Sequence, residues 1–186
     1  MKKILLTIVA VLAAVNMNAQ VYVGGSIGFG SVKPIGGGDS EFTFRILPEI
    51  GYNFTDQWAA GIVLGYQKGT CSIGNGDYNA SDTETFKIAP YVRYTALEWE
   101  MVKLFFDGAF SFSSTKDWGS NFAGGISPGI AVALTDEITF VTHLGFFGFE
   151  TFSPGDALKA QGYTKSGSEF GLDFRNNCSF GVYFNF

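Results

Sequence analysis

The chain of 186 residues has little charge, little proline, two cysteines and one histidine. Charged residues make up 16% of it, against roughly 25% in an ordinary soluble domain. The 12 Lys+Arg are outnumbered by 17 Asp+Glu, which excludes a basic nucleic-acid-binding tail and leads us to expect no nucleic-acid partner. Past Gln20 no apolar run approaches the roughly 18 residues of a membrane-spanning helix. A helical membrane protein is therefore excluded.

Glycine and aromatic residues are abundant. The chain holds 25 glycines and 20 phenylalanines, and 46% of its residues are hydrophobic. Such a composition excludes intrinsic disorder and indicates one compact domain. With His143, Cys71 and Cys178 dispersed along the chain, no transition-metal site is predicted by spacing, and we expect no cofactor. The two cysteines either pair or remain independent thiols.

The first 19 residues have the organisation of a secretory signal peptide. Lys2 and Lys3 precede an apolar stretch from Ile4 to Val15, and the small residue Ala19 precedes Gln20. That stretch rises about 18 Å as a helix, too short for a hydrocarbon core of about 30 Å. We therefore predict a cleaved signal peptide at 1–19 and a single domain at 20–186.

Eight segments of the mature chain alternate in hydropathy with a period of two, as strands do. Large apolar residues take one parity, while glycine, alanine and serine take most of the other. Six charged residues inside the segments all share the face of small residues: Arg45, Glu49, Lys87, Arg93, Lys103 and Asp107. We predict that they form a paired network in which Glu49 and Asp107 each lie near more than one base, because unpaired buried charges are costly.

This pattern predicts an all-β fold, an eight-stranded antiparallel up-and-down transmembrane β-barrel. A soluble sandwich would turn its large apolar residues inward and leave lysine, glutamate and threonine outside. Here the second face is small enough for the narrow lumen of an eight-stranded barrel. Ten residues tilted near 45° rise about 23 Å, close to the roughly 25 Å apolar band of such barrels.

An internal repeat predicts the topology. Pro48, Pro90 and Pro128 each precede an acidic residue by eight positions, which places short turns near 55–57, 97–100 and 135–137. The connections at the opposite end are longer: 31–41, 68–84, 113–121 and 150–177. Short turns at one end and long loops at the other are typical of a bacterial outer-membrane barrel with both termini in the periplasm. Because proline lacks a ladder donor, we expect β-bulges at the three prolines.

Aromatic residues gather near both ends of the predicted strands. Membrane barrels carry such aromatic girdles at the two lipid–water interfaces. The girdle predicted near the short turns comprises Tyr52, Trp58, Tyr94 and Trp99. The girdle predicted near the long loops comprises Tyr66, Phe112, Trp118, Phe149 and Phe152.

The signal peptide, the segment Pro-Glu-Ile-Gly-Tyr-Asn-Phe-Thr-Asp-Gln-Trp at 48–58 and the alternating C-terminal strand resemble the small OmpA/OmpX/opacity-type outer-membrane barrels. The resemblance implies an outer-membrane location, contact with outer-membrane lipid and recognition by the barrel-assembly machinery. The C-terminal residues matching that assembly signal are Phe180, Val182, Phe184 and Phe186.

The sequence favours a non-enzymatic barrel with a structural or surface-interaction role, its loops binding a possible extracellular ligand. Two alternatives stay open. A narrow gated pore would require the charge network to open. A lipid A-modifying enzyme would require His143 to meet an acid and a nucleophile at the outer rim. The lipid A deacylase type has this architecture but needs His-x-Ser, whereas Leu144 and Gly145 follow here, so we expect a histidine packed in the lumen.

Overall fold

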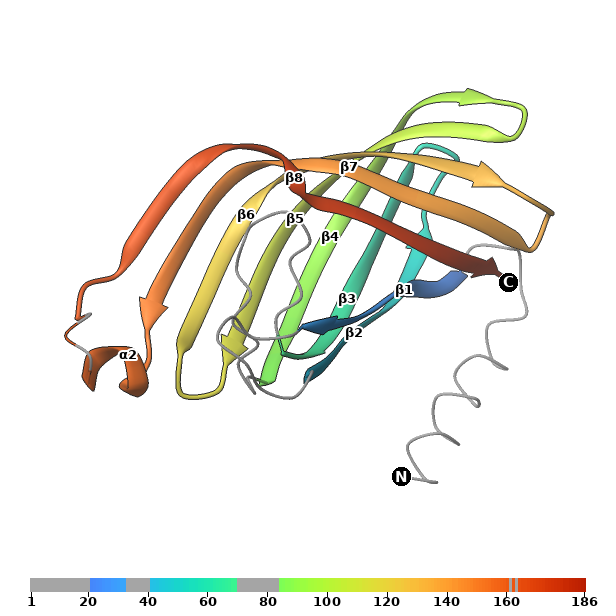
Figure 1. Cartoon of the computed structure of the whole chain (residues 1–186). Coiled ribbons are helices and arrows are strands. Elements are labelled where there is room, and N and C mark those ends of the chain that lie inside the picture. The colour runs from blue at the N-terminus through green and yellow to red at the C-terminus, as the bar shows by residue number, and fades with distance from the viewer. Residues whose placement is uncertain (1–20, 33–40, 70–83, 161, 163) are drawn as a thin grey trace.

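The computed structural model describes residues 21–32, 41–69, 84–160, 162 and 164–186. Within them the strands close, each antiparallel to the next, into a barrel with the order β1 to β8 (Figure 1). The predicted signal peptide, Cys71 and most of the first two long loops lie outside these residues, as does the side chain of Cys178. In the described part of the chain, no helix has the length and apolarity needed to cross a membrane.

The eight strands confirm the predicted all-β, eight-stranded antiparallel up-and-down barrel. Each pairs with its neighbour in the chain, and β1 also pairs with β8. The strands are β1 Val21–Val32, β2 Glu41–Asn53, β3 Trp58–Lys68, β4 Glu84–Trp99, β5 Val102–Thr115, β6 Gly119–Ala133, β7 Ile138–Pro154 and β8 Gly167–Asn185. A short helix, α2 (Asp156–Ala160), lies between β7 and β8.

Two of the predicted short turns share one geometry, because they share one sequence pattern. In the β2–β3 turn, the Thr55 hydroxyl accepts hydrogen bonds from the backbone N–H of Gln57 and Trp58, at 3.3 and 3.0 Å. In the β6–β7 turn, the Thr135 hydroxyl accepts from the N–H of Glu137 and Ile138, at 3.2 and 3.1 Å. The third turn lies at 100–101, later than predicted, because β4 continues to Trp99. We call this end of the barrel the turn end.

At the opposite end, the loop end, two predicted loops are corrected. The stretch 113–121 is a hairpin with a three-residue turn at 116–118, and Asp117 takes the left-handed conformation with φ 63°. The stretch 150–177 is mostly strand, since β7 and β8 remain paired up to Phe152↔Gly167. The small polar residues at these strand ends have the composition of a loop. They nevertheless form strand, because each pairs with a residue of the neighbouring strand. The first two loops begin and end within two residues of their predicted bounds.

β-Bulges were expected at Pro48, Pro90 and Pro128, and the prediction is confirmed at Pro128 alone. The β6–β7 register shifts across Pro128, opposite Gly145 with φ 135°. At Pro48 and Pro90 the prediction is wrong, because pairing is interrupted on one side of each without a register shift. Each proline stays paired with its other neighbour. A missing N–H therefore breaks one ladder locally without adding a residue to the strand.

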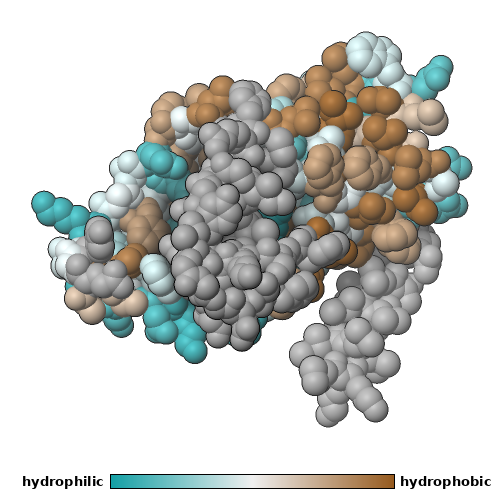
Figure 2. All heavy atoms as spheres, viewed as in Figure 1, coloured by the Kyte–Doolittle hydropathy of each residue, from teal (hydrophilic) through white to brown (hydrophobic). Residues whose placement is uncertain are grey.

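The outer surface of the barrel is a belt of apolar side chains. Figure 2 shows hydrophobic residues gathered over the upper and right-hand parts of this view, with hydrophilic residues around α2. The predicted C-terminal residues all point outward, and their exposed fractions run from 39% for Val182 to 64% for Phe180. The turn-end aromatics are also exposed, with Trp58 and Tyr94 packed at 4.8 Å between ring centroids. The sequence parity thus places the large apolar residues outside.

Four lumen aromatics each lie against a glycine directly opposite on the neighbouring strand. These pairs are Tyr22 with Gly51, Tyr91 with Gly61, Phe105 with Gly129 and Tyr183 with Gly24. A Cβ added at any of these glycines would lie within 2.4 Å of its aromatic side chain. The glycines of the lumen face therefore provide the space that the rings fill.

We expect Gly129→Ala to destabilise the barrel by about 1–3 kcal/mol, because its methyl group would overlap the Phe105 ring. Gly108→Ala is the matched control, since a Cβ there meets its nearest atom at 3.9 Å. Urea unfolding of the refolded protein in detergent measures both. Equal stability of the two variants would contradict the aromatic–glycine packing.

Candidate functional site

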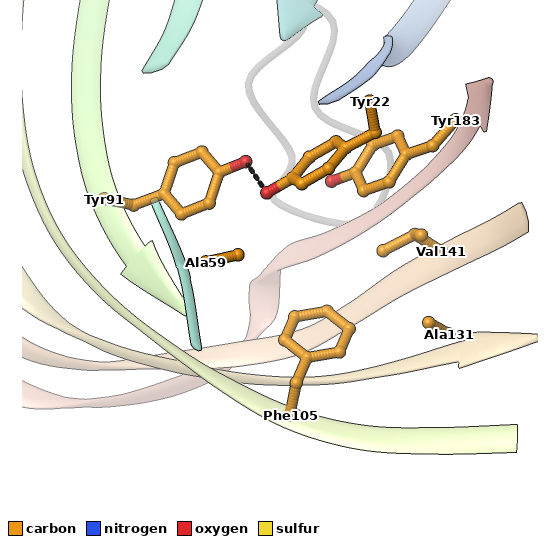
Figure 3. Close-up of a cluster of buried hydrophobic side chains, with 7 residues drawn as sticks. All are labelled: Tyr22, Ala59, Tyr91, Phe105, Ala131, Val141 and Tyr183. Carbon is orange, nitrogen blue, oxygen red and sulfur yellow. Dashed lines mark hydrogen bonds between the residues drawn. The ribbon is translucent and has the colours of Figure 1, made fainter. Parts of the chain in front are cut away.

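The centre of the lumen is filled by Arg93 and four aromatic rings. The guanidinium lies 4.0 Å from the centroid of Phe105 and between 5.3 and 5.8 Å from the centroids of the three tyrosines. Tyr22 and Tyr183 stack at 5.1 Å, and the hydroxyls of Tyr22 and Tyr91 are hydrogen-bonded at 2.6 Å (Figure 3). We call Arg93, Tyr22, Tyr91, Phe105 and Tyr183 the lumen plug.

Two buried carboxylates lie against the guanidinium of Arg93. Asp107 accepts two parallel hydrogen bonds from the guanidinium, both at 2.7 Å. Glu49 lies 3.7 Å from the same group and accepts a hydrogen bond from the Tyr91 hydroxyl. All three charged residues are less than 9% exposed. A bidentate arginine–carboxylate pair of this kind fixes orientation as well as charge.

The lumen plug separates two hollows. On the turn side lies a vestibule of about 580 Å³, lined by Arg93, Phe105 and the residues of the short turns. On the loop side lies a smaller chamber of about 160 Å³, lined by polar residues including Lys87, His143 and Ser179. We call the second hollow the upper chamber. Val141 and Tyr183 line both hollows, as expected for residues of the partition.

The structure brings three of the six predicted network residues together and separates the other three. Arg93, Glu49 and Asp107 form the central cluster. Lys103 pairs instead with Glu98 at 2.8 Å, where both side chains are more than 40% exposed. Lys87 lines the upper chamber, and Arg45 is exposed on the loop side of Glu49. Asp107 contacts two bases, Arg93 and His143, whereas the described ion pair of Glu49 is with Arg93.

His143 lies in the lumen, with an acid on one side and a hydroxyl on the other. Its Nε2 is 2.8 Å from Asp107 Oδ2, and its Nδ1 is 3.3 Å from the Ser179 hydroxyl. The ring also meets Phe105 edge-on at 5.4 Å. His143 is thus packed in the lumen as predicted, and it meets the acid and the hydroxyl in mid-barrel, against the lumen plug, rather than at the outer rim.

Sequence reasoning missed most of the plug aromatics and the serine. Tyr22, Phe105 and Tyr183 lie at the alternate positions that otherwise carry small residues. Their size at those positions is a sequence signal for aromatic rings inside the lumen. Ser179 carried no comparable signal, because its contact with His143 depends on the β7–β8 register. Among the described residues, no group of three or more His, Cys, Asp or Glu is placed to hold a metal ion.

We expect Arg93→Met to destabilise the protein by about 3–5 kcal/mol, because it leaves two buried carboxylates without their cation. Lys103→Met is the control, and its loss should stay below about 1 kcal/mol, as for other exposed pairs. Urea unfolding measures both variants. Adding Glu49→Gln and Asp107→Asn to Arg93→Met should recover part of the loss, and no recovery would contradict the charge argument.

No protein-family model and no curated protein sequence matches the chain. Among solved structures, the barrel is similar to Neisserial surface protein A (NspA) with a TM-score of 0.50. The match covers 89% of this chain and 97% of the neisserial chain at 15% sequence identity. The comparison supports the eight-stranded barrel fold.

Proposed function

We propose that the chain is an integral outer-membrane barrel with a closed lumen, which acts without catalysis by presenting its loop end to the cell exterior. The observation that carries this proposal is the apolar belt around a closed barrel whose lumen is blocked at its centre by the lumen plug. Hydrocarbon offers no hydrogen-bond partners, so a closed ladder with outward apolar side chains suits it. The fold shared with a neisserial surface protein supports the same location.

The loop end is the part best suited to surface interactions. The β5–β6 and β7–β8 hairpins extend the wall there, and α2 joins β7 to β8. Loops held by a rigid scaffold are common sites of recognition. We propose a structural or ligand-binding role for this surface, with the short turns and both termini in the periplasm.

An epitope inserted after Asp117 should be accessible to antibody on intact cells, because that residue tops the β5–β6 hairpin. The matched insertion after Asp136, in the β6–β7 turn, should be detected only after the outer membrane is permeabilised. Flow cytometry of both strains measures this. The opposite pattern would reverse the proposed orientation.

Because the lumen plug blocks the centre of the barrel, we expect the unmodified protein to show no conductance above background in a planar bilayer. Arg45→Ala with Lys103→Ala should leave it there, because neither residue belongs to the plug. Replacing Phe105 by Ala and Arg93 by Gly should join the two hollows and produce measurable channels. Conductance by the unmodified protein would instead favour the narrow-pore alternative.

One arrangement favours a second candidate function, an acyl-ester hydrolase. Asp107, His143 and Ser179 are in hydrogen-bond contact in the order acid, imidazole, hydroxyl. In that reaction the Ser179 oxygen attacks the ester carbonyl carbon as its proton passes to His143 Nδ1. The imidazolium protonates the leaving alcohol, and water then hydrolyses the acyl-serine.

A fluorophosphonate probe separates the two candidates. If the non-enzymatic proposal holds, the folded protein gains no mass, because Ser179 is not an activated nucleophile. A hydrolase would gain one adduct that Ser179→Ala abolishes. Ser127→Ala, which changes another serine of the upper chamber, should then keep the adduct. Intact-protein mass spectrometry measures all three.

A further inference from the structure

The loop-end part of β8 is a strand with one free edge. Residues 167–172 pair with β7 along one side. On the other side, the ladder between β1 and β8 covers only residues 182–185 of β8. Among the described strands, β7 alone therefore pairs with residues 167–172. In Figure 1 this part of β8 lies at the border of the strands, next to α2. We call residues 167–172 the β8 edge.

Every residue of the β8 edge is exposed. The side chains of Phe170 and Leu172 are 71% and 59% exposed. A Cβ added at Gly167 or Gly171 would meet no atom within 4 Å beyond its chain neighbours. The edge also contains no proline or lysine, the residues with which proteins commonly prevent strand addition. Its unpaired N–H and C=O groups are therefore accessible to another strand.

The two faces of the β8 edge differ in chemistry. The outer face carries Phe170 and Leu172, and the ring of Phe170 meets that of Phe147 in β7 edge-on at 5.2 Å. The inner face carries Glu169, flanked by the two glycines. Side chains directly opposite each other in a sheet share a face. A strand added to this edge therefore needs apolar residues on its outer face.

The charge of Glu169 defines what the inner face of an added strand needs. Glu169 lies directly opposite another carboxylate, Glu150 of β7, and like charges in that position destabilise a pair of strands. Glu150 has partners, because it accepts a hydrogen bond from Asn121 and interacts electrostatically with Lys87. For Glu169 no ion pair or side-chain hydrogen bond is found among the described residues. A basic side chain opposite Glu169 is therefore the complementary group.

We propose that the β8 edge binds an extended segment of a partner protein by antiparallel strand addition. Read from its N-terminus, the segment has an apolar residue beside Leu172, any residue next, an apolar residue beside Phe170 and a basic residue beside Glu169. Backbone hydrogen bonds provide the attachment in this mode, and the alternate side chains provide the selection. The inference rests on the proposed function, because only a loop end at the cell exterior meets extracellular proteins.

A second copy of the barrel in the same membrane does not fit this edge. Two identical strands pair antiparallel around a two-fold axis normal to the sheet. That axis lies in the plane of the membrane, so it would invert the second barrel. Parallel pairing of two copies would continue the face of Glu169 in one copy into the face of Phe170 in the other. A different protein therefore suits the edge better.

A synthetic peptide, Ser-Thr-Val-Thr-Val-Lys-Thr-Ser, tests strand addition to the purified, folded protein in detergent. We expect binding that is lost when the amides of one alternate set of its residues are N-methylated, and kept when the other set is methylated. The reason is that only one set of N–H groups faces β8. Equal effects of the two methylated peptides, or no binding at about 1 mM peptide, would overturn the proposal. Isothermal titration calorimetry measures each affinity.

Reversal of charge tests the contact with Glu169. Glu169→Lys should raise the Kd for this peptide about tenfold, because a like-charged pair replaces an opposite one. The same peptide with glutamate in place of lysine should recover the affinity for Glu169→Lys. Asp56→Lys is the matched control, since that exposed residue lies at the turn end, and it should leave the Kd unchanged. Equal affinity for Glu169→Lys and the unmodified protein would contradict the basic residue at Glu169.

A photoreactive form of the peptide locates its binding site and separates this proposal from the proposed function. We expect cross-links to the β8 edge on intact cells. Cross-links confined to other strands, or binding that appears only after residues 33–40 are deleted, would overturn the proposal. Cross-links to the β8 edge only after the outer membrane is permeabilised would refute the proposed orientation and support the edge.

Discussion

The pairing of Arg93 with Asp107 is the interaction on which the interior of this barrel depends. Both groups are buried, and burying either alone would cost several kcal/mol. Their bidentate contact fixes the guanidinium at the middle of the lumen, where four aromatic rings surround it. Glu49 and the Tyr183 hydroxyl then contact this fixed guanidinium, and the Tyr91 hydroxyl donates a hydrogen bond to Glu49. The partition between vestibule and upper chamber follows from that one pair.

The glycines of the lumen face follow from the same constraint. An eight-stranded barrel is narrow, and four rings fit around one guanidinium only where the opposite strand has no side chain. Gly24, Gly51, Gly61 and Gly129 occupy those positions. The high glycine content is thus explained at these sites by packing rather than by flexibility.

Strand parity predicted most of the architecture, because a period of two records which face each residue takes. It placed Phe180 outside, and it placed Arg93 and Asp107 inside together. Parity does not determine how far a strand continues toward the loop end. The predicted loops at 113–121 and 150–177 are therefore longer than the loops in the structure. It also carries no information on contacts that depend on register. The pairing of Lys103 with Glu98, rather than with the central cluster, could therefore not be predicted. The same holds for the contact between Ser179 and His143.

In the proposed location, the closed barrel lies in the outer membrane with its apolar belt in lipid. Electrophoresis of the outer-membrane fraction, with boiled and unboiled samples side by side, tests this location. We expect a band in that fraction whose migration shifts on boiling, because a stable closed barrel then unfolds. A protein recovered in the soluble periplasmic fraction, with no shift, would instead make the apolar face the core of a secreted β-protein.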